Sequence, residues 1–229
     1  MRWTTALCRV APRREPKMHF VFVHGWGFNP AIWRDVIGNI GNADVSLVDL
    51  GFISGGPKVA ATWPSDAIAV GHSLGALWLL HRAGEEGGAS FRGLVSIQGF
   101  DSFCPHIPPS RVAGMRRGLR RDPGQTLEAF WRGGGTEPFA SPEALNVERL
   151  DEGLGWLLDW DEAEVKAKLA CPTLALAARD DAIVPVAMSE AIWGSDTIRW
   201  SETGGHVLPL KHPQWCAGHV LDFAHALKS

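Results

Sequence analysis

The stretch AIAVGHSLGALWLL, residues 67–80, decides the fold. It places Ser73 between Gly71 and Gly75, where an apolar run gives way to a helical pattern. In a sharp turn between a strand and a helix the flanking residues come so close together that a Cβ would clash, and glycine avoids that clash. The pattern therefore predicts a serine raised on a tight strand-to-helix bend. A glycine-rich strand end that arose by chance is the alternative.

Similar short apolar runs recur along the chain and predict further strands. They are MHFVFVHG (18–25), DVSLVDLGF (44–52), DAIAVGHS (66–73), FRGLVSIQGF (91–100), CPTLALAARDD (171–181) and DTIRWSETGGH (196–206). Because these runs are continuously apolar rather than alternating, they indicate a sheet that is covered on both faces. Helical patterns separate them, including NPAIWRDVIGNI, LGALWLLHRAG and a last helix that begins near His212. The sequence therefore predicts a mostly parallel α/β sheet flanked by helices.

The alternation of strand and helix breaks between residues 101 and 165. This stretch is rich in proline and glycine, and VAGMRRGLRR, QTLEAFWR and ERLDEGLGWLLDW read as short helices. The leucines of the last of these fall on one helical face. We expect residues 101–165 to form a small helical lid inserted into one core domain, which is made of residues 1–100 and 166–229.

The composition is that of an ordinary globular protein. The 229 residues are 45% hydrophobic and 21% charged, and the net charge of −3 offers no general attraction to nucleic acid. The four cysteines lie far apart, without a C-x-x-C pair that would indicate zinc or redox chemistry: Cys8, Cys104, Cys171 and Cys216. No apolar run is long enough to span a membrane, and the basic N-terminus lacks the features of a signal peptide. We expect a cytoplasmic monomer with reduced thiols, no metal, no cofactor, and no nucleic-acid or membrane partner.

A reactive serine needs two partners, and both follow later strands. A base must take the proton of the hydroxyl, and a carboxylate must orient that base. Asp180 and Asp181 follow the apolar strand that ends at residue 178, and His206 follows the next one. The order along the chain is serine, aspartate, histidine. The sequence thus predicts a nucleophile, Ser73, with His206 as its base and one of the two aspartates as the acid.

Gly71 to Gly75 matches the G-x-S-x-G motif, and with these partners the chain resembles the α/β-hydrolase superfamily over nearly its whole length. In the D-x-x-V-P pattern of that superfamily the acid stands four residues before the proline, which selects Asp181 and leaves Asp180 as the alternative. HGWG at 24–27 is similar to the superfamily's oxyanion loop. The resemblance implies that the backbone amides of Trp26 and Leu74 form the oxyanion hole and that both residues line the acyl pocket.

Six stretches resemble, within the superfamily, the pimeloyl-[acyl-carrier protein] methyl ester esterases of biotin synthesis. They are HGWGFNPAIW, LVDLGF, GHSLGALWLL, TLEAFW, DDAIVPV and GGHVLPLKHP. This resemblance implies a serine carboxylesterase that hydrolyses a methyl ester on an acyl chain held by acyl-carrier protein. It also implies that the lid contributes substrate contacts, for which we expect Phe130, Trp131 and Gly134.

The segment that we expect to form the lid carries a cluster of arginines in a protein of net negative charge: Arg111, Arg116, Arg117, Arg120 and Arg121. Acyl-carrier proteins are acidic, so this face is a candidate docking surface, although a solvated helix face explains the cluster equally well. Two other functions remain open. One is a broad-specificity carboxylesterase that acts on small esters without a carrier protein. The other is a catalytically silent hydrolase fold that serves as a binding module.

Overall fold

The computed structural model describes residues 17–56, 62–85 and 90–227. Cys8 and the basic stretch at the N-terminus lie outside these residues. The three cysteines within the described residues, Cys104, Cys171 and Cys216, are free thiols. Burial raises the pKa of the Cys216 thiol to about 12.

The described residues form a six-stranded sheet in which every neighbouring pair of strands is parallel. Its spatial order is β2-β1-β3-β4-β5-β6. The strands are β1 (His19–Val23), β2 (Asp44–Val48), β3 (Ile68–His72), β4 (Gly93–Ile97), β5 (Thr173–Ala178) and β6 (Ile198–Ser201). Each lies within one of the six apolar runs, so the predicted mostly parallel α/β sheet is confirmed. Strands β3 and β4 are buried along their whole length, as expected for a sheet covered on both faces.

The connections between the strands explain which helices share a face. The connection from β1 to β2 and the connection from β3 to β4 run in opposite directions across the sheet, and right-handed crossovers place their helices on opposite faces. Helix α1 (Arg34–Ile40), preceded by the 3-10 turn η1 (Pro30–Trp33), contacts α9 (Pro213–Ala226). Helix α2 (Leu74–Gly84) contacts α6 (Ala163–Lys168). Helix α7 (Val186–Trp193) lies along β5 and β6, and the short α8 (Leu208–Lys211) precedes α9.

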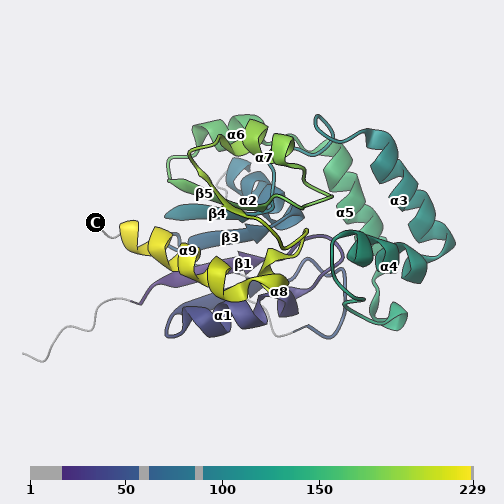
Figure 1. Cartoon of the computed structure of the whole chain (residues 1–229), viewed down its shortest axis with the longest axis horizontal. Helices are drawn as coiled ribbons and strands as arrows, with labels where there is room; N and C mark the ends of the chain where they lie inside the picture. The colour runs from purple at the N-terminus through teal and green to yellow at the C-terminus, as the bar shows by residue number, and fades with distance from the viewer. Residues whose placement is uncertain (1–16, 57–61, 86–89, 228–229) are drawn as a thin grey trace, which may run out of the picture.

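The segment between β4 and β5 is helical, as the sequence predicts. It contains α3 (Pro109–Arg121), α4 (Pro123–Gly133), η2 (Pro142–Ala144) and α5 (Val147–Asp159). Side chains cap the N-termini of two of these helices. Asp122 accepts a hydrogen bond from the backbone amide of Gln125 at the start of α4, and Asn146 accepts one from the backbone amide of Arg149 at the start of α5. These helices gather at one end of the strands (Figure 1). Their treatment as a separate lid, residues 101–165, stays a prediction.

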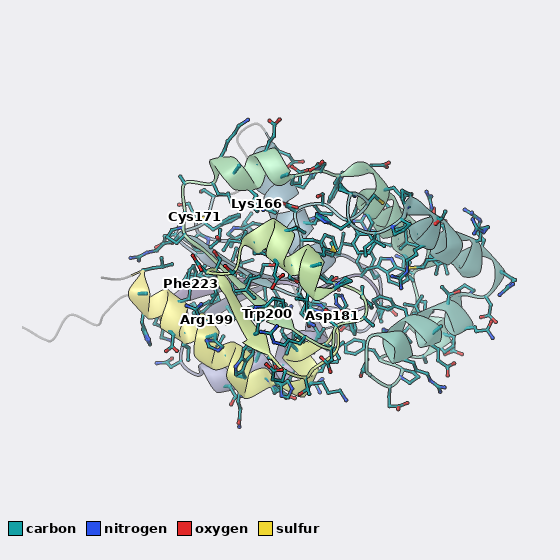
Figure 2. All side chains as sticks on the ribbon, turned by 45° about the horizontal axis from the view of Figure 1, so that its top comes forward. Lys166, Cys171, Asp181, Arg199, Trp200 and Phe223 are labelled. Atoms are coloured by element: carbon teal, nitrogen blue, oxygen red, sulfur yellow. The ribbon has the colours of Figure 1, made fainter. Side chains whose placement is uncertain are left out.

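The carboxyl ends of the parallel strands point toward these helices. Figure 2 shows this for β5, with Cys171 before the strand and Asp181 after it, on the side of α3 and α4. The connections that follow β1 and β3, which are neighbouring strands, leave in opposite directions across the sheet. At such a point a crevice opens at the carboxyl ends of the two strands. The loop after β1 and the turn after β3 therefore lie side by side at the rim of the sheet.

Within the described residues, no helix is both long enough and apolar enough to cross a membrane.

Candidate active site

Ser73 stands on a strained turn between β3 and α2. Its φ of 53° lies in the left-handed region that L side chains rarely adopt. A Cβ on Gly71 would lie 2.5 Å from the backbone nitrogen of Ala76, and one on Gly75 would lie 2.3 Å from the carbonyl oxygen of Val23. Both glycines are therefore required by contact with backbone, which cannot move aside as a side chain could. This is the steric reason for the spacing of the G-x-S-x-G motif.

The side chains of Ser73, His206 and Asp181 form a continuous hydrogen-bonded chain. Nε2 of His206 lies 2.8 Å from Oγ of Ser73, and Nδ1 of His206 lies 2.8 Å from Oδ2 of Asp181. All three residues are buried, with 7%, 1% and 6% of their surfaces exposed, respectively. With Nδ1–H donating to the carboxylate, Nε2 is free to accept the serine proton. The arrangement can activate a hydroxyl for attack on an acyl carbon.

Asp180 and Asp181, the two candidates for the acid, have different hydrogen-bond partners. Asp181 contacts the imidazole through Oδ2, while its Oδ1 accepts hydrogen bonds from the backbone amides of Ile183 (2.8 Å) and Val184 (2.9 Å). Asp180 instead accepts from the backbone amides of Gly204 (3.2 Å) and Gly205 (2.9 Å). Asp180 thus braces the loop that carries His206, and Asp181 orients the ring itself.

The backbone amide and carbonyl of His206 form two further hydrogen bonds that hold this residue in place. Its amide donates to the carbonyl of Gly134 (2.8 Å), and its carbonyl accepts from Nε2 of His72 (2.9 Å). His72 is buried, and burial together with the neighbouring His206 holds its pKa well below 6.5. His72 is therefore a neutral imidazole with its proton on Nε2. It is a structural donor in the site and carries no charge there.

The predicted oxyanion loop lies against Ser73. A Cβ on Gly25 would stand 2.9 Å from the Cβ of Ser73, so only glycine allows this approach. The next residue, Trp26, is buried and its indole donates to the carbonyl of Leu150 (2.8 Å). Leu74 is the first residue of α2, where an amide has no acceptor within the helix. Both amides therefore belong to backbone that borders the serine.

A cavity of about 770 Å³ opens at Ser73 and extends between α3 and α4. Trp26, Leu74 and Phe130 line it, and their predicted role as substrate contacts stays a prediction. Trp131 and Gly134 are not among its lining residues, and their role as substrate contacts stays a prediction. The indole of Trp131 donates to the carbonyl of Gly27 (2.8 Å), and the Gly134 carbonyl accepts from the amide of His206.

Most of the cavity wall was missed by the sequence analysis. Its apolar lining includes Phe100, Phe103, Ile107, Met115, Leu157 and Ile183. These residues come from the loop after β4, from α3, from α5 and from the loop that carries the acid. No periodic pattern joins them in the sequence, because the fold alone brings these segments together.

The five arginines on α3 do not form one uniform surface. Arg111 and Arg121 line the cavity, and Arg117 is exposed. Arg116 forms a two-pronged ion pair with Asp151 on α5, with its Nε 2.8 Å from Oδ1, and this contact lowers the pKa of the Asp151 carboxyl. Arg120 lies 3.9 Å from the same carboxylate. Arg116 therefore has a partner within the chain, so the charge available to a docked partner is smaller than the sequence indicates.

Among the residues that the structure describes, no group of three or more His, Cys, Asp or Glu side chains is arranged to hold a metal ion.

Comparisons with known proteins agree with this architecture. No protein-family model matches the chain. The chain is 26% identical over 230 residues to the pimeloyl-[acyl-carrier protein] methyl ester esterase of Aeromonas hydrophila, an alignment that covers 85% of this chain and 90% of that protein. It is 28% identical over 234 residues to the protein of the same name from Salmonella newport, covering 87% and 91%.

A solved structure shows the same fold. A hydrolase from Pseudomonas aeruginosa superposes with a TM-score of 0.72 at 18% sequence identity, covering 91% of this chain and 90% of that one. The protein thus has the α/β-hydrolase fold. Its sequence resembles the pimeloyl-[acyl-carrier protein] methyl ester esterases, as the sequence motifs indicate.

Proposed function

We propose that the protein is a serine carboxylesterase, with Ser73 as nucleophile, His206 as general base and Asp181 as the acid that orients it. The observation that supports this most directly is the hydrogen-bonded chain from Asp181 through His206 to Ser73, which ends at an apolar cavity. An ester with an apolar acyl chain fits such a cavity, with its carbonyl beside the serine.

In the proposed acylation step, Oγ of Ser73 bonds to the ester carbonyl carbon while its proton passes to Nε2 of His206. The carbonyl oxygen becomes negative and accepts hydrogen bonds from the amides of Trp26 and Leu74. Each such donor contributes about 3 kcal/mol to the stability of the transition state. The Asp181 carboxylate stabilises the imidazolium that forms. His206 then protonates the departing alcohol, and the acyl group stays on the serine.

In the proposed deacylation step, water takes the place of the alcohol. His206 accepts a proton from the water as its oxygen attacks the acyl carbon, and the same two amides hold the oxyanion. The bond to Oγ of Ser73 breaks, the serine regains its proton from His206, and the free carboxylic acid leaves. Apart from the ester and the water, both steps use groups that the chain itself supplies.

For the substrate, we propose the methyl ester of a pimeloyl chain carried by acyl-carrier protein. Relatives with this name align with most of the chain, and an extended acyl chain fits the apolar cavity. Exposed guanidinium groups on α3 would attract an acidic carrier protein. Arg117 and Arg120 serve this role in the proposal together with Arg111 and Arg121 at the cavity.

One observation favours a second candidate, a carboxylesterase for small esters without a carrier partner. The ion pair between Arg116 and Asp151 neutralises part of the basic face on which docking depends. Rate measurements on both kinds of substrate separate the two candidates.

The test compares methanol release from methyl pimeloyl-carrier protein with hydrolysis of p-nitrophenyl butyrate. We expect the wild type to cleave both esters and Ser73→Ala to cleave neither. In Arg117→Glu/Arg120→Glu the ratio of the carrier-bound rate to the small-ester rate should fall roughly 10-fold or more, because steering of charged partners has that magnitude. Arg34→Glu, an exposed charge reversal on α1, is the matched control and should leave the ratio unchanged.

Cleavage of p-nitrophenyl butyrate alone would select the small-ester candidate. If a fluorophosphonate failed to label Ser73 and neither ester were cleaved, the esterase proposal would be wrong and a binding module would take its place.

A further inference from the structure

Gln98 stands out by its backbone. It directly follows β4 and has a φ of 52°. Among the described residues, Ser73 is the other non-glycine residue with a positive φ. A glutamine gains nothing locally from this conformation, and glycine would adopt it without strain. Such strain persists where the surrounding contacts impose it and is common at functional sites.

The side chain of Gln98 bonds to both loops that carry the partners of Ser73. Its Nε2 donates to Oδ2 of Asp181 (2.8 Å) and to the carbonyl oxygen of Gly205. Its Oε1 accepts from the amide of Leu208 (2.8 Å). Gly205 and Leu208 stand on either side of His206. One amide group therefore connects the acid to the loop of the base.

These partners leave the amide one orientation. If the amide were reversed, its oxygen would face two acceptors and its NH₂ group would face a donor. Gln98 is 1% exposed, so water cannot replace any of the three bonds. Both N–H groups and the oxygen are thus used within the site, and none is left for another role.

We propose that Gln98 is a positioning residue that fixes the Asp181 carboxylate and the His206 loop relative to each other. This inference rests on the proposed function of Ser73, His206 and Asp181. Oδ2 of Asp181 receives two donors, Nδ1 of His206 and Nε2 of Gln98, so the second donor sets the angle at which the carboxylate meets the ring.

A neutral residue at position 98 also matters for the charge around His206. The groups that face its ring are the Asp181 carboxylate, the Ser73 hydroxyl and the neutral ring of His72, whose centroid is 5.2 Å away. Gln98 adds a donor to this set without adding charge. A carboxylate in its place would bring a second negative charge close to the imidazole and would favour the protonated ring, which cannot accept the serine proton.

The experiment measures how fast a fluorophosphonate labels Ser73 between about pH 5 and 9, the range in which a histidine base titrates. In this reaction Oγ bonds to phosphorus, fluoride leaves, and the serine proton passes to His206. The variants are Gln98→Glu, which is nearly isosteric, and Gln98→Met, which keeps the volume but removes all three hydrogen bonds. The values of kcat and KM for p-nitrophenyl butyrate are measured alongside.

Trp193→Phe is the matched control. Its indole donates to the carbonyl of Gly99 (2.9 Å), next to Gln98, so the variant also loses one buried hydrogen bond. It leaves every contact of Asp181 and His206 in place. Thermal unfolding of all variants separates a loss of stability from a loss of reactivity.

We expect both Gln98 variants to label roughly 10- to 100-fold more slowly at neutral pH, the size expected for a lost buried hydrogen bond to a charged group. The fall should appear in kcat rather than KM. In Gln98→Glu the acid side of the pH profile should also move to higher pH. Trp193→Phe should unfold at a lower temperature and keep the wild-type labelling rate and profile. If Gln98→Glu does not fold, Gln98→Met carries the test through its labelling rate.

Wild-type labelling rates and pH profile in Gln98→Met or Gln98→Glu would overturn the inference while the esterase proposal stood. A wild type that labels but cleaves no ester would overturn the esterase proposal, and slow labelling of the Gln98 variants would still support positioning. A wild type that does not label at all would overturn both.

Discussion

The loops at the rim of the sheet and the helices that face them are built in different ways. Around Asp181 and His206, polar atoms are bonded to one another at distances near 2.8 Å, and the side chains are buried. The wall of the open cavity, to which α3 and α4 contribute, is mainly apolar when all its segments are taken together. The first region is specified by directional bonds and the second by shape. Changes in the first should therefore alter the reaction itself, whereas changes in the second should alter which substrate is accepted.

The largest expected effect divides the two adjacent aspartates within the rim. Asp181→Asn should lower kcat by roughly 10⁴-fold, because an asparagine can leave the imidazole in the wrong tautomer. Asp180→Asn should cost about 10-fold or less, since it weakens two backbone contacts of the histidine loop and leaves the ring bond in place. Initial rates on p-nitrophenyl butyrate measure both.

A greater loss in Asp180→Asn than in Asp181→Asn would exchange their roles. Binding of an unreactive phosphonate ester at both variants provides the control that the cavity is intact.

Substitutions at two glycines, one beside Ser73 and one on the cavity wall, should change the stability of the protein in opposite directions. Gly75→Ala places a methyl group 2.3 Å from the carbonyl oxygen of Val23 and should destabilise the fold by about 2 kcal/mol or more. Gly114 lies on the cavity side of α3, where a Cβ meets nothing nearer than a guanidinium nitrogen of Arg117 at 3.8 Å. Gly114→Ala should stabilise the protein by roughly 0.5–1 kcal/mol through helix propensity. Urea unfolding of both variants gives the two free energies.

Gly114→Leu extends the same comparison to substrate choice. The leucine side chain should occupy part of the cavity and lower kcat/KM for long acyl esters more than for acetate esters. Equal loss on both would mean that this part of α3 does not border the acyl chain.

The sequence predicts the rim better than the wall, for physical reasons. Strands β3, β4 and β5 are buried along most of their length, whereas β2 and β6 are partly exposed. Ser73 directly follows β3, Asp181 lies three residues after β5 and His206 lies five residues after β6, so local pattern and chain order are enough to propose them. Their catalytic roles stay predictions. The position of Gln98 in the site was not predicted, because its hydrogen bonds join residues 83 to 110 positions away in the sequence and no local pattern indicates them.

The helices show a similar division. Helix α5 is predicted from the leucines on one of its faces, and α3 and α4 from short helical patterns, whereas α7 and the four-residue α8 were missed because short helices leave little periodicity. The partner of Arg116 was also hidden, since Asp151 lies 35 residues away on another helix.

A pH-dependent effect on stability is expected from His72, the buried histidine beside the nucleophile. Burial holds the pKa of His72 in the folded protein well below 6.5. When the pH falls below 6.5, this histidine therefore becomes protonated in the unfolded chain but stays neutral in the folded protein. The free energy of unfolding should therefore fall as the pH falls, by up to about 1.4 kcal/mol per pH unit from this one group. His72→Gln removes the titration and keeps an amide donor for the His206 carbonyl. Urea unfolding at neutral pH and at about pH 5 should show that the wild type loses up to about 2 kcal/mol more than the variant. If the wild type and His72→Gln lost equal free energy of unfolding, His72 would be protonated in the folded protein. A positive charge would then lie beside His206, contrary to the neutral ring described above.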